Sequence, residues 1–190
     1  MKRFTMWTML ATVILVIVLL TPGCTSNTGN QTPSAGGSTT PSASSIITYN
    51  GANFTIQYPS DWTHSSNTLS VTEIFSAWPP KATNTTNATL LVTSSNVLEP
   101  SLSEWTAGWL KALQNQSNFT QIDAGNATLA GYPAYKIVYT FTGPYGDSKV
   151  TEIWTVKDGN VYEIWYSAYP KYYDIYADTA QKMIDSFQIK

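Results

Sequence analysis

The clearest structural signal in the chain is KVTEIWTVKDGNVYEIWYSA, residues 149–168. Two runs rich in β-branched and aromatic residues, Lys149–Val156 and Val161–Ala168, flank the turn Lys157-Asp158-Gly159-Asn160. Asp-Gly between such runs is typical of a tight hairpin turn, because these residues tolerate positive φ. The segment therefore predicts a pair of antiparallel strands.

Other strand-like segments lie on both sides of this hairpin and are separated by short turns. Asn50-Gly51 stands between two of them and predicts a second hairpin. Pro79-Pro80 ends another, and the polar segment 82–88 is expected to be a loop. The expected strands are Ile46–Tyr49, Asn53–Tyr58, Val71–Trp78, Thr89–Ser94, Phe119–Asp123, Ala127–Leu129 and Tyr135–Thr142.

Two helices are expected among these strands. Ser101-x-x-Glu104 fits a capping box and marks the start of the first helix. Its apolar residues follow one stripe of a 3.6-residue period, at Leu102, Trp105, Trp109, Leu110 and Leu113. The second helix is expected from about Tyr172 to Phe187, with Tyr176, Ala180, Met183 and Phe187 on one face. Strands joined by short turns, without a βαβ rhythm, favour an α+β domain with a largely antiparallel sheet and helices on both faces.

The N-terminus has the features of a targeting segment. Lys2 and Arg3 precede the apolar run Met9–Leu20, which is shorter than a membrane-spanning helix requires. Thr21-Pro22-Gly23-Cys24 then resembles the lipobox of prokaryotic lipoproteins, although Thr21 replaces the usual Leu. We therefore expect residues 1–23 to be a signal peptide and Cys24 to carry the lipid anchor. An uncleaved N-terminal anchor helix is the alternative, and either one places the domain at the extracellular face of the cell membrane.

The segment after Cys24 predicts a flexible tether. Residues 25–45 hold no charge and no large apolar side chain, so they cannot bury enough surface to offset the entropy of ordering. The domain organisation is then signal peptide 1–23, lipidated Cys and linker 24–45, and one folded domain 46–190. Seven Asn-x-Ser/Thr sequons favour a glycosylated, archaeal cell surface. They are Asn30, Asn53, Asn84, Asn87, Asn115, Asn118 and Asn126.

Composition excludes several functions for the domain. The chain of 190 residues carries a net charge of −2 and no basic cluster, which argues against nucleic-acid binding. Its one Cys is Cys24 and its one Arg is Arg3, so the domain has no Cys nucleophile, CxxC pair, Cys-type zinc site or Arg fork for an anion. No cofactor and no metal site is predicted.

Three segments resemble Mog1/PsbP-like domains, the family related to PsbP. They are Phe54–Trp62 (FTIQYPSDW), Leu129–Tyr135 (LAGYPAY), and the turn at Asp158-Gly159 taken with the helix end Ile184–Phe187. The resemblance covers about residues 46–190 and implies an α/β/α sandwich with a central antiparallel sheet. Known members dock on photosystem II and help retain calcium and chloride, or bind the GTPase Ran. No residue here matches those roles, so the resemblance implies only the fold and a non-enzymatic binding module.

Two groups of residues could carry chemistry. Asp61 and His64, among serines, could form part of a Ser/His/Asp site, but the Gly patterns that usually accompany one are absent, and a surface loop is the simpler interpretation. Glu152 and Glu163 lie on partner strands and could act on a glycoside if the turn register places them on one face. They could equally be solvent-side hairpin residues, and no catalytic residue is assigned.

Aromatic residues crowd the C-terminal part of the chain. Most are expected in the core, while Tyr169, Tyr172 and Tyr173 are candidates for an exposed binding face. The sequence thus predicts a membrane-anchored extracellular binding or assembly module whose partner is an envelope protein or a glycan. The alternatives are a cell-surface hydrolase that uses acidic residues and a purely structural envelope lipoprotein.

Overall fold

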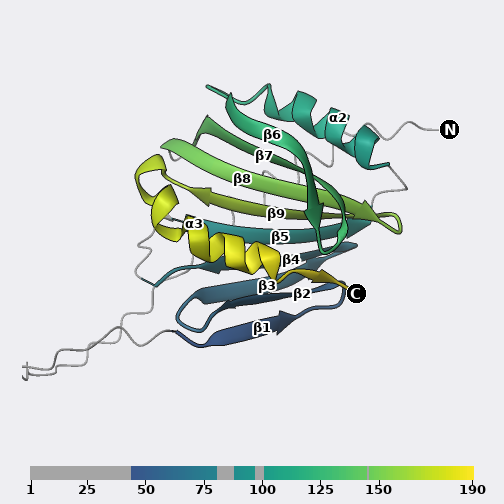
Figure 1. Ribbon diagram of the computed structural model, residues 1–190, viewed down its shortest axis with the longest axis vertical. Coiled ribbons are helices and arrows are strands. Elements are labelled where there is room, and N and C mark those ends of the chain that lie inside the picture. The colour runs from purple at the N-terminus through teal and green to yellow at the C-terminus, as the bar shows by residue number, and fades with distance from the viewer. Residues whose placement is uncertain (1–43, 81–87, 97–100, 145) are drawn as a thin grey trace, which may run out of the picture. The chain divides into compact units, whose positions relative to one another are not determined.

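The computed structural model describes residues 44–80, 88–96, 101–144 and 146–190, and residues 44–190 form one compact unit. Cys24, the signal segment and residues 24–43 of the linker lie outside the described residues. The strands form a large sheet of seven and a small sheet of three, with helices α2 (Leu102–Leu113) and α3 (Pro170–Asp185) packed on them (Figure 1). This is the expected α+β architecture with antiparallel sheets.

The large sheet is antiparallel throughout, and its neighbours are mostly consecutive in sequence. Its strands in spatial order are β3 (Thr63–Leu69), β4 (Thr72–Trp78), β5 (Ala88–Asn96), β9 (Asn160–Ala168), β8 (Gly146–Lys157), β7 (Tyr132–Gly143) and β6 (Thr120–Leu129). The exception to sequential order is β5, which pairs with β9, so the two meanders β3–β5 and β6–β9 join along that seam.

The small sheet consists of β1 (Ile46–Asn50), β2 (Phe54–Pro59) and β10 (Gln188–Ile189). The hairpin expected at Asn50-Gly51 is present, and its loop spans residues 51–53. The C-terminal β10 pairs with β2, which ties the end of the chain to its first hairpin.

The central hairpin β8–β9 forms as expected. Asp158 and Gly159 both have positive φ, 50° and 73°, as the tight turn requires. Because the turn fixes the register, Glu152 pairs with Trp165 and Trp154 pairs with Glu163. The side chains of Glu152 and Glu163 therefore emerge on the same face of the sheet as diagonal neighbours.

The two helices cover opposite faces of the large sheet. On β8, the hydroxyl of Thr151 hydrogen-bonds to Tyr173 of α3, whereas the next residue, Glu152, accepts a hydrogen bond from Trp109 of α2. Successive side chains of a strand point to opposite faces, so α3 and α2 lie on different sides.

The capping box at the start of α2 is present, since Ser101 Oγ accepts a hydrogen bond from the Glu104 N–H and the Glu104 carboxyl accepts one from the Ser101 N–H.

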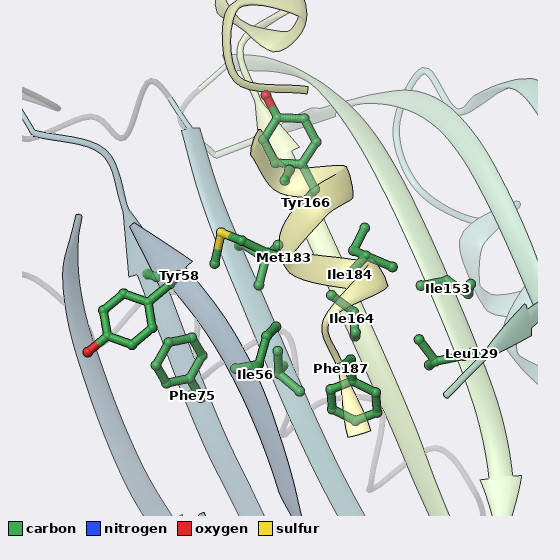
Figure 2. Close-up of a cluster of buried hydrophobic side chains, with 14 of the residues drawn as sticks. Ile56, Tyr58, Phe75, Leu129, Ile153, Ile164, Tyr166, Met183, Ile184 and Phe187 are labelled. Atoms are coloured by element: carbon green, nitrogen blue, oxygen red, sulfur yellow. The ribbon is translucent and has the colours of Figure 1, made fainter. Parts of the chain in front are cut away.

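The main hydrophobic core lies between α3, β2 and the α3 face of the large sheet. Figure 2 shows Met183, Ile184 and Phe187 beside Ile164 of β9 and Ile56 of β2. All five side chains are buried. The core therefore joins the small sheet to the large one through the C-terminal helix.

Three elements differ from the expectation. His64 and the serines beside it, expected in a surface loop, lie on edge strand β3, because pairing with β4 supplies hydrogen bonds that the polar sequence THSSNTL does not signal. The expected strands Phe119–Asp123 and Ala127–Leu129 are one continuous strand, β6, with a bulge between Gln121 and Asp123. The second helix starts at Pro170, where proline suits the first turn.

Candidate functional site

A groove of about 590 Å³ lies on the α3 face, between the end of α3 and the turn that joins β6 to β7. This volume falls in the range of ligand sites in proteins, about 300–1,000 Å³. The lining residues come from β6, β7, β8, α3 and β10. They are Ala127, Thr128, Leu129, Ala130, Gly131, Lys136, Ile153, Gln181, Ile184, Asp185 and Gln188.

The groove combines an apolar floor with a polar rim. Leu129, Ile153 and Ile184 are buried and form the floor, and Figure 2 shows them together beside α3. Lys136 is half-buried, pairs with Ile153 across the strands and so faces the same side. Gln181 and Asp185 of α3 are exposed and hydrogen-bond to each other. Such a surface suits a ligand that has both apolar and hydrogen-bonding groups.

On the opposite face, Glu152 and Glu163 are buried beneath α2. Glu152 is fully buried and Glu163 is 8% exposed. The indole Nε1 of Trp109 donates to Glu152 Oε1 at 2.5 Å, and the Tyr139 hydroxyl donates to Glu152 Oε2 at 3.1 Å. The two acids that sequence reasoning could only place on partner strands thus share one buried, aromatic environment.

Glu163 has a parallel set of partners. Trp105 Nε1 of α2 donates to Glu163 Oε1 at 3.3 Å, and the Thr93 hydroxyl of β5 donates to Glu163 Oε2 at 3.4 Å. The rings of Trp105 and Trp109 stack on α2 with centroids 6.0 Å apart, which places their N–H groups over neighbouring carboxyls. Each glutamate therefore receives one indole hydrogen bond from the same helix.

Burial shifts the pKa of both acids upward. Desolvation raises the pKa of Glu163 to about 7, while the hydrogen bonds from Trp105 and Thr93 offset part of the shift. The pKa of Glu152 lies well above its ordinary value of 4.5, first because of burial and then because of the negative charge of Glu163. Among the described residues, the ion pairs are Lys149–Asp174 and Lys157–Asp158, so neither buried carboxyl is neutralised by a cation.

The position of the pair limits what it can do chemically. Neither Glu152 nor Glu163 lines the groove, which lies on the other face of the sheet. A general acid or base must come within hydrogen-bonding reach of its substrate. With α2 in place, both carboxyls contact protein donors instead.

The other candidate residues are dispersed. Asp61 and His64 are exposed, and His64 Nδ1 lies 3.1 Å from the Tyr58 hydroxyl on β2. Within the described residues no hydrogen bond joins His64 to Asp61 or to a serine, so a Ser/His/Asp arrangement is not assembled there. The described residues also hold no group of three or more His, Cys, Asp or Glu placed to bind a metal.

The three candidate tyrosines do not form one exposed surface. Tyr173 is buried, because its ring packs on Tyr166 and its hydroxyl meets Thr151. This burial removes it from the expected face. Tyr169 and Tyr172 are half-buried, and Lys171 lies over the Tyr172 ring. Ligand binding by these two rings stays a prediction.

The described sequons differ in accessibility. Asn115, Asn118 and Asn126 are exposed, the first two after α2 and the third on edge strand β6, whereas Asn53 is half-buried in the β1–β2 loop. Asn30, Asn84 and Asn87 lie outside the described residues. No helix in the described part of residues 44–190 is long and apolar enough to cross a membrane.

Sequence reasoning missed Glu73, a third buried acid. Its carboxylate joins β4 to the β1–β2 loop by accepting from the Ala52 N–H at 2.9 Å, the Asn53 N–H at 2.7 Å and the Tyr49 hydroxyl at 2.9 Å. The available sequence signal was a single acid inside the predicted strand Val71–Trp78, whose other residues are all uncharged. Its role is to hold the two sheets together.

An antiparallel sheet with one helix packed on each face matches the PsbP-like fold. The chain belongs to the family of PsbP-like proteins, whose model matches residues 7–189. The resemblance seen in Phe54–Trp62 and Leu129–Tyr135 is thus confirmed at the level of family and fold. No curated protein sequence matches the chain significantly.

Solved structures agree with this assignment. Cyanobacterial PsbP (CyanoP) from Synechocystis sp. PCC 6803 is 16% identical, with a TM-score of 0.57 over 83% of this chain and 98% of that chain. LpqN, described as involved in cell envelope biogenesis of Mycobacterium tuberculosis, is 15% identical, with a TM-score of 0.54 over 77% and 91%. PA94 from Pseudomonas aeruginosa, a protein of unknown function and putative regulator, is 13% identical, with a TM-score of 0.51 over 72% and 92%. At these identities the likeness establishes the fold.

Proposed function

We propose that the protein is a non-enzymatic binding or assembly module of the cell envelope, held at the extracellular face of the membrane by a lipid on Cys24. The groove beside α3 is the observation that carries this proposal, because it offers buried apolar surface with a few polar groups around it. The likeness to LpqN, a protein involved in cell envelope biogenesis, supports the location. The lipobox-like Cys24 and the exposed sequons support an archaeal cell surface.

The groove favours a protein segment over a glycan as the ligand. Sugar rings pack best on flat aromatic side chains with polar tips, and the groove lining contains none. Its Gln181 and Gln188 amides can instead donate to and accept from a peptide backbone, while Leu129 and Ile153 receive apolar side chains. The partner expected here is therefore an envelope protein.

The burial of both glutamates speaks against the alternative of a glycan-directed hydrolase. Glu152 and Glu163 do share a face, which that function requires, but α2 covers both carboxyls. A substrate would reach them only after α2 moved. A binding role needs no such movement, because the groove is open on the other face.

Site-specific photocrosslinking in native membranes tests the proposal. A benzoylphenylalanine at Gln181, in the groove, is expected to give a discrete protein adduct, and the same group at Asp158, exposed on the β8–β9 turn, is expected to give none. Ala127→Leu, which fills the groove, should abolish the adduct. Identical products at both positions, or an adduct that survives Ala127→Leu, would count against a ligand site in the groove.

For the anchor, an N-terminal peptide that retains unmodified Met1 by mass spectrometry would reject lipidation at Cys24.

A further inference from the structure

Two side chains of helix α2 reach the buried acids of the sheet. Trp105 and Trp109 each donate an indole hydrogen bond to one carboxyl, and the Trp109 ring packs against Trp165 with centroids 6.2 Å apart. A third bond runs from Trp154 Nε1 to the Thr106 hydroxyl at 2.9 Å. Of these three hydrogen bonds, two end on a carboxyl whose charge depends on pH.

The surroundings of the carboxyls make their ionisation costly while α2 is closed. The groups that face them are Tyr139 of β7, Thr93 of β5, Trp154 and Trp165 of the central hairpin, Trp105 and Trp109 of α2, and each carboxyl itself. The only titratable groups in this set are Tyr139 and the two acids, and all three carry either no charge or a negative one. The charged residues of α2, Glu104 and Lys111, are exposed, so no cation from the helix enters the set.

We propose that α2 is a pH-operated cover, closed over the glutamate pair when the pair holds its protons and released from the sheet when Glu163 loses its proton. Release would let water reach the carboxylates and so remove the cost of burying charge. It would also expose Trp165 and Tyr139, a surface of flat rings beside two carboxylates on the face opposite the groove. This device acts independently of ligand binding in the groove.

The size of the effect follows from linkage. Glu163 has a folded pKa of about 7 and an ordinary value of 4.5 when water reaches it. Between pH 5 and pH 8 the ratio of closed to open α2 is therefore expected to fall by about 70-fold. The sign is fixed, because the closed form binds the proton more tightly and is favoured at the lower pH.

Native-state hydrogen exchange of the full chain tests the cover. Protection factors of residues 102–113, corrected for the intrinsic pH dependence of exchange, should fall by about 70-fold from pH 5 to pH 8. At low urea concentrations this exchange should be insensitive to urea, because local opening exposes little surface, whereas exchange in β8 and β9 should rise with urea. In Glu163→Gln the fall should be much smaller, and in the double variant Glu152→Gln, Glu163→Gln it should be absent.

Three outcomes would overturn the proposal. The first is an equal fall in wild type and in Glu163→Gln. The second is a fall that shows the same urea dependence in α2 as in β8 and β9, since that pattern reports global unfolding. The third is no fall at all. Trp105→Phe serves as a second variant if a Gln substitution impairs folding, since it removes the donor to Glu163 and keeps a ring; opening should then increase at pH 5 as well.

Discussion

The substitution Gly51→Ala is expected to destabilise the domain severely. An alanine Cβ at this position would lie 1.7 Å from Glu73 Oε1 and 2.7 Å from Tyr49 Cε1, both far inside van der Waals contact. The carboxylate must then move, although it accepts hydrogen bonds from the Ala52 N–H, the Asn53 N–H and the Tyr49 hydroxyl. The cost therefore falls on the contact that joins the two sheets.

The magnitude can be worked from the bonds that break. Displacing Oε1 loses at least the bonds from Tyr49 and Ala52, and hydrogen bonds to charged groups contribute about 1.5–3 kcal/mol each. We therefore expect the free energy of unfolding to fall by about 3–6 kcal/mol in urea titrations monitored by circular dichroism.

A matched control exists within the same chain. A Cβ built on Gly125 of β6 meets nothing within 4 Å, so Gly125→Ala should change the free energy of unfolding by less than about 1 kcal/mol. In a Glu73→Ala background the cost of Gly51→Ala should shrink by about 2 kcal/mol or more, because the clashing Glu73 atoms are gone and only the contact with Tyr49 Cε1 remains. The reasoning is refuted if Gly51→Ala lies within about 1 kcal/mol of Gly125→Ala, or if the two substitutions at 51 and 73 are additive.

Three further predictions concern the acids, the cap and a surface ion pair. Because Glu163 has a folded pKa of about 7, raised from 4.5, the stability present at acid pH is lost as pH rises towards 7. Wild type should lose about 3 kcal/mol by pH 8 in urea titrations, and Glu163→Gln should lose clearly less; equal losses would contradict the assignment. Ser101→Ala removes the capping box of α2 and should cost about 1 kcal/mol, with exchange of the first-turn amides increasing most. Asp174→Asn breaks the salt bridge to Lys149, and the Asp174 side chain is 86% exposed. Because such exposed ion pairs contribute about 0–1 kcal/mol, the thermal midpoint should change by a barely measurable amount.

Local sequence signals were sufficient to predict the elements that a turn motif, a capping motif or an apolar stripe specifies. The Asp158-Gly159 turn, the Ser101–Glu104 cap and the apolar stripe of α2 each depend on neighbours within a few residues, and all three appear as expected. Strand β3 was not predicted, because its sequence is polar and it is stabilised by pairing with β4. Periodicity carries no information where neither face of a strand is buried.

The candidate sites needed tertiary information. Hairpin register determines that Glu152 and Glu163 share a face, but their burial depends on α2 lying above them, which no local pattern specifies. The groove is made by β6, β7, β8, α3 and β10 together, and no segment of the sequence signals it. Tyr173 was expected on an exposed face and is buried. An aromatic residue in the first turns of a helix can face solvent or core, and contact with Tyr166 places this one in the core.

The seam between β5 and β9 sets an expected order of events in folding. Strands β6 to β9 pair with their sequence neighbours and require only short loops to close, whereas the register Ala88↔Ala168 and Asn96↔Asn160 joins distant parts of the chain. We expect the β6–β9 meander to form early and the seam to close late. Until it closes, β9 presents an unpaired apolar edge to any other strand nearby. A second copy of the chain could supply its own β5 to that edge, so concentrated refolding should yield exchanged dimers as the characteristic misfolded product.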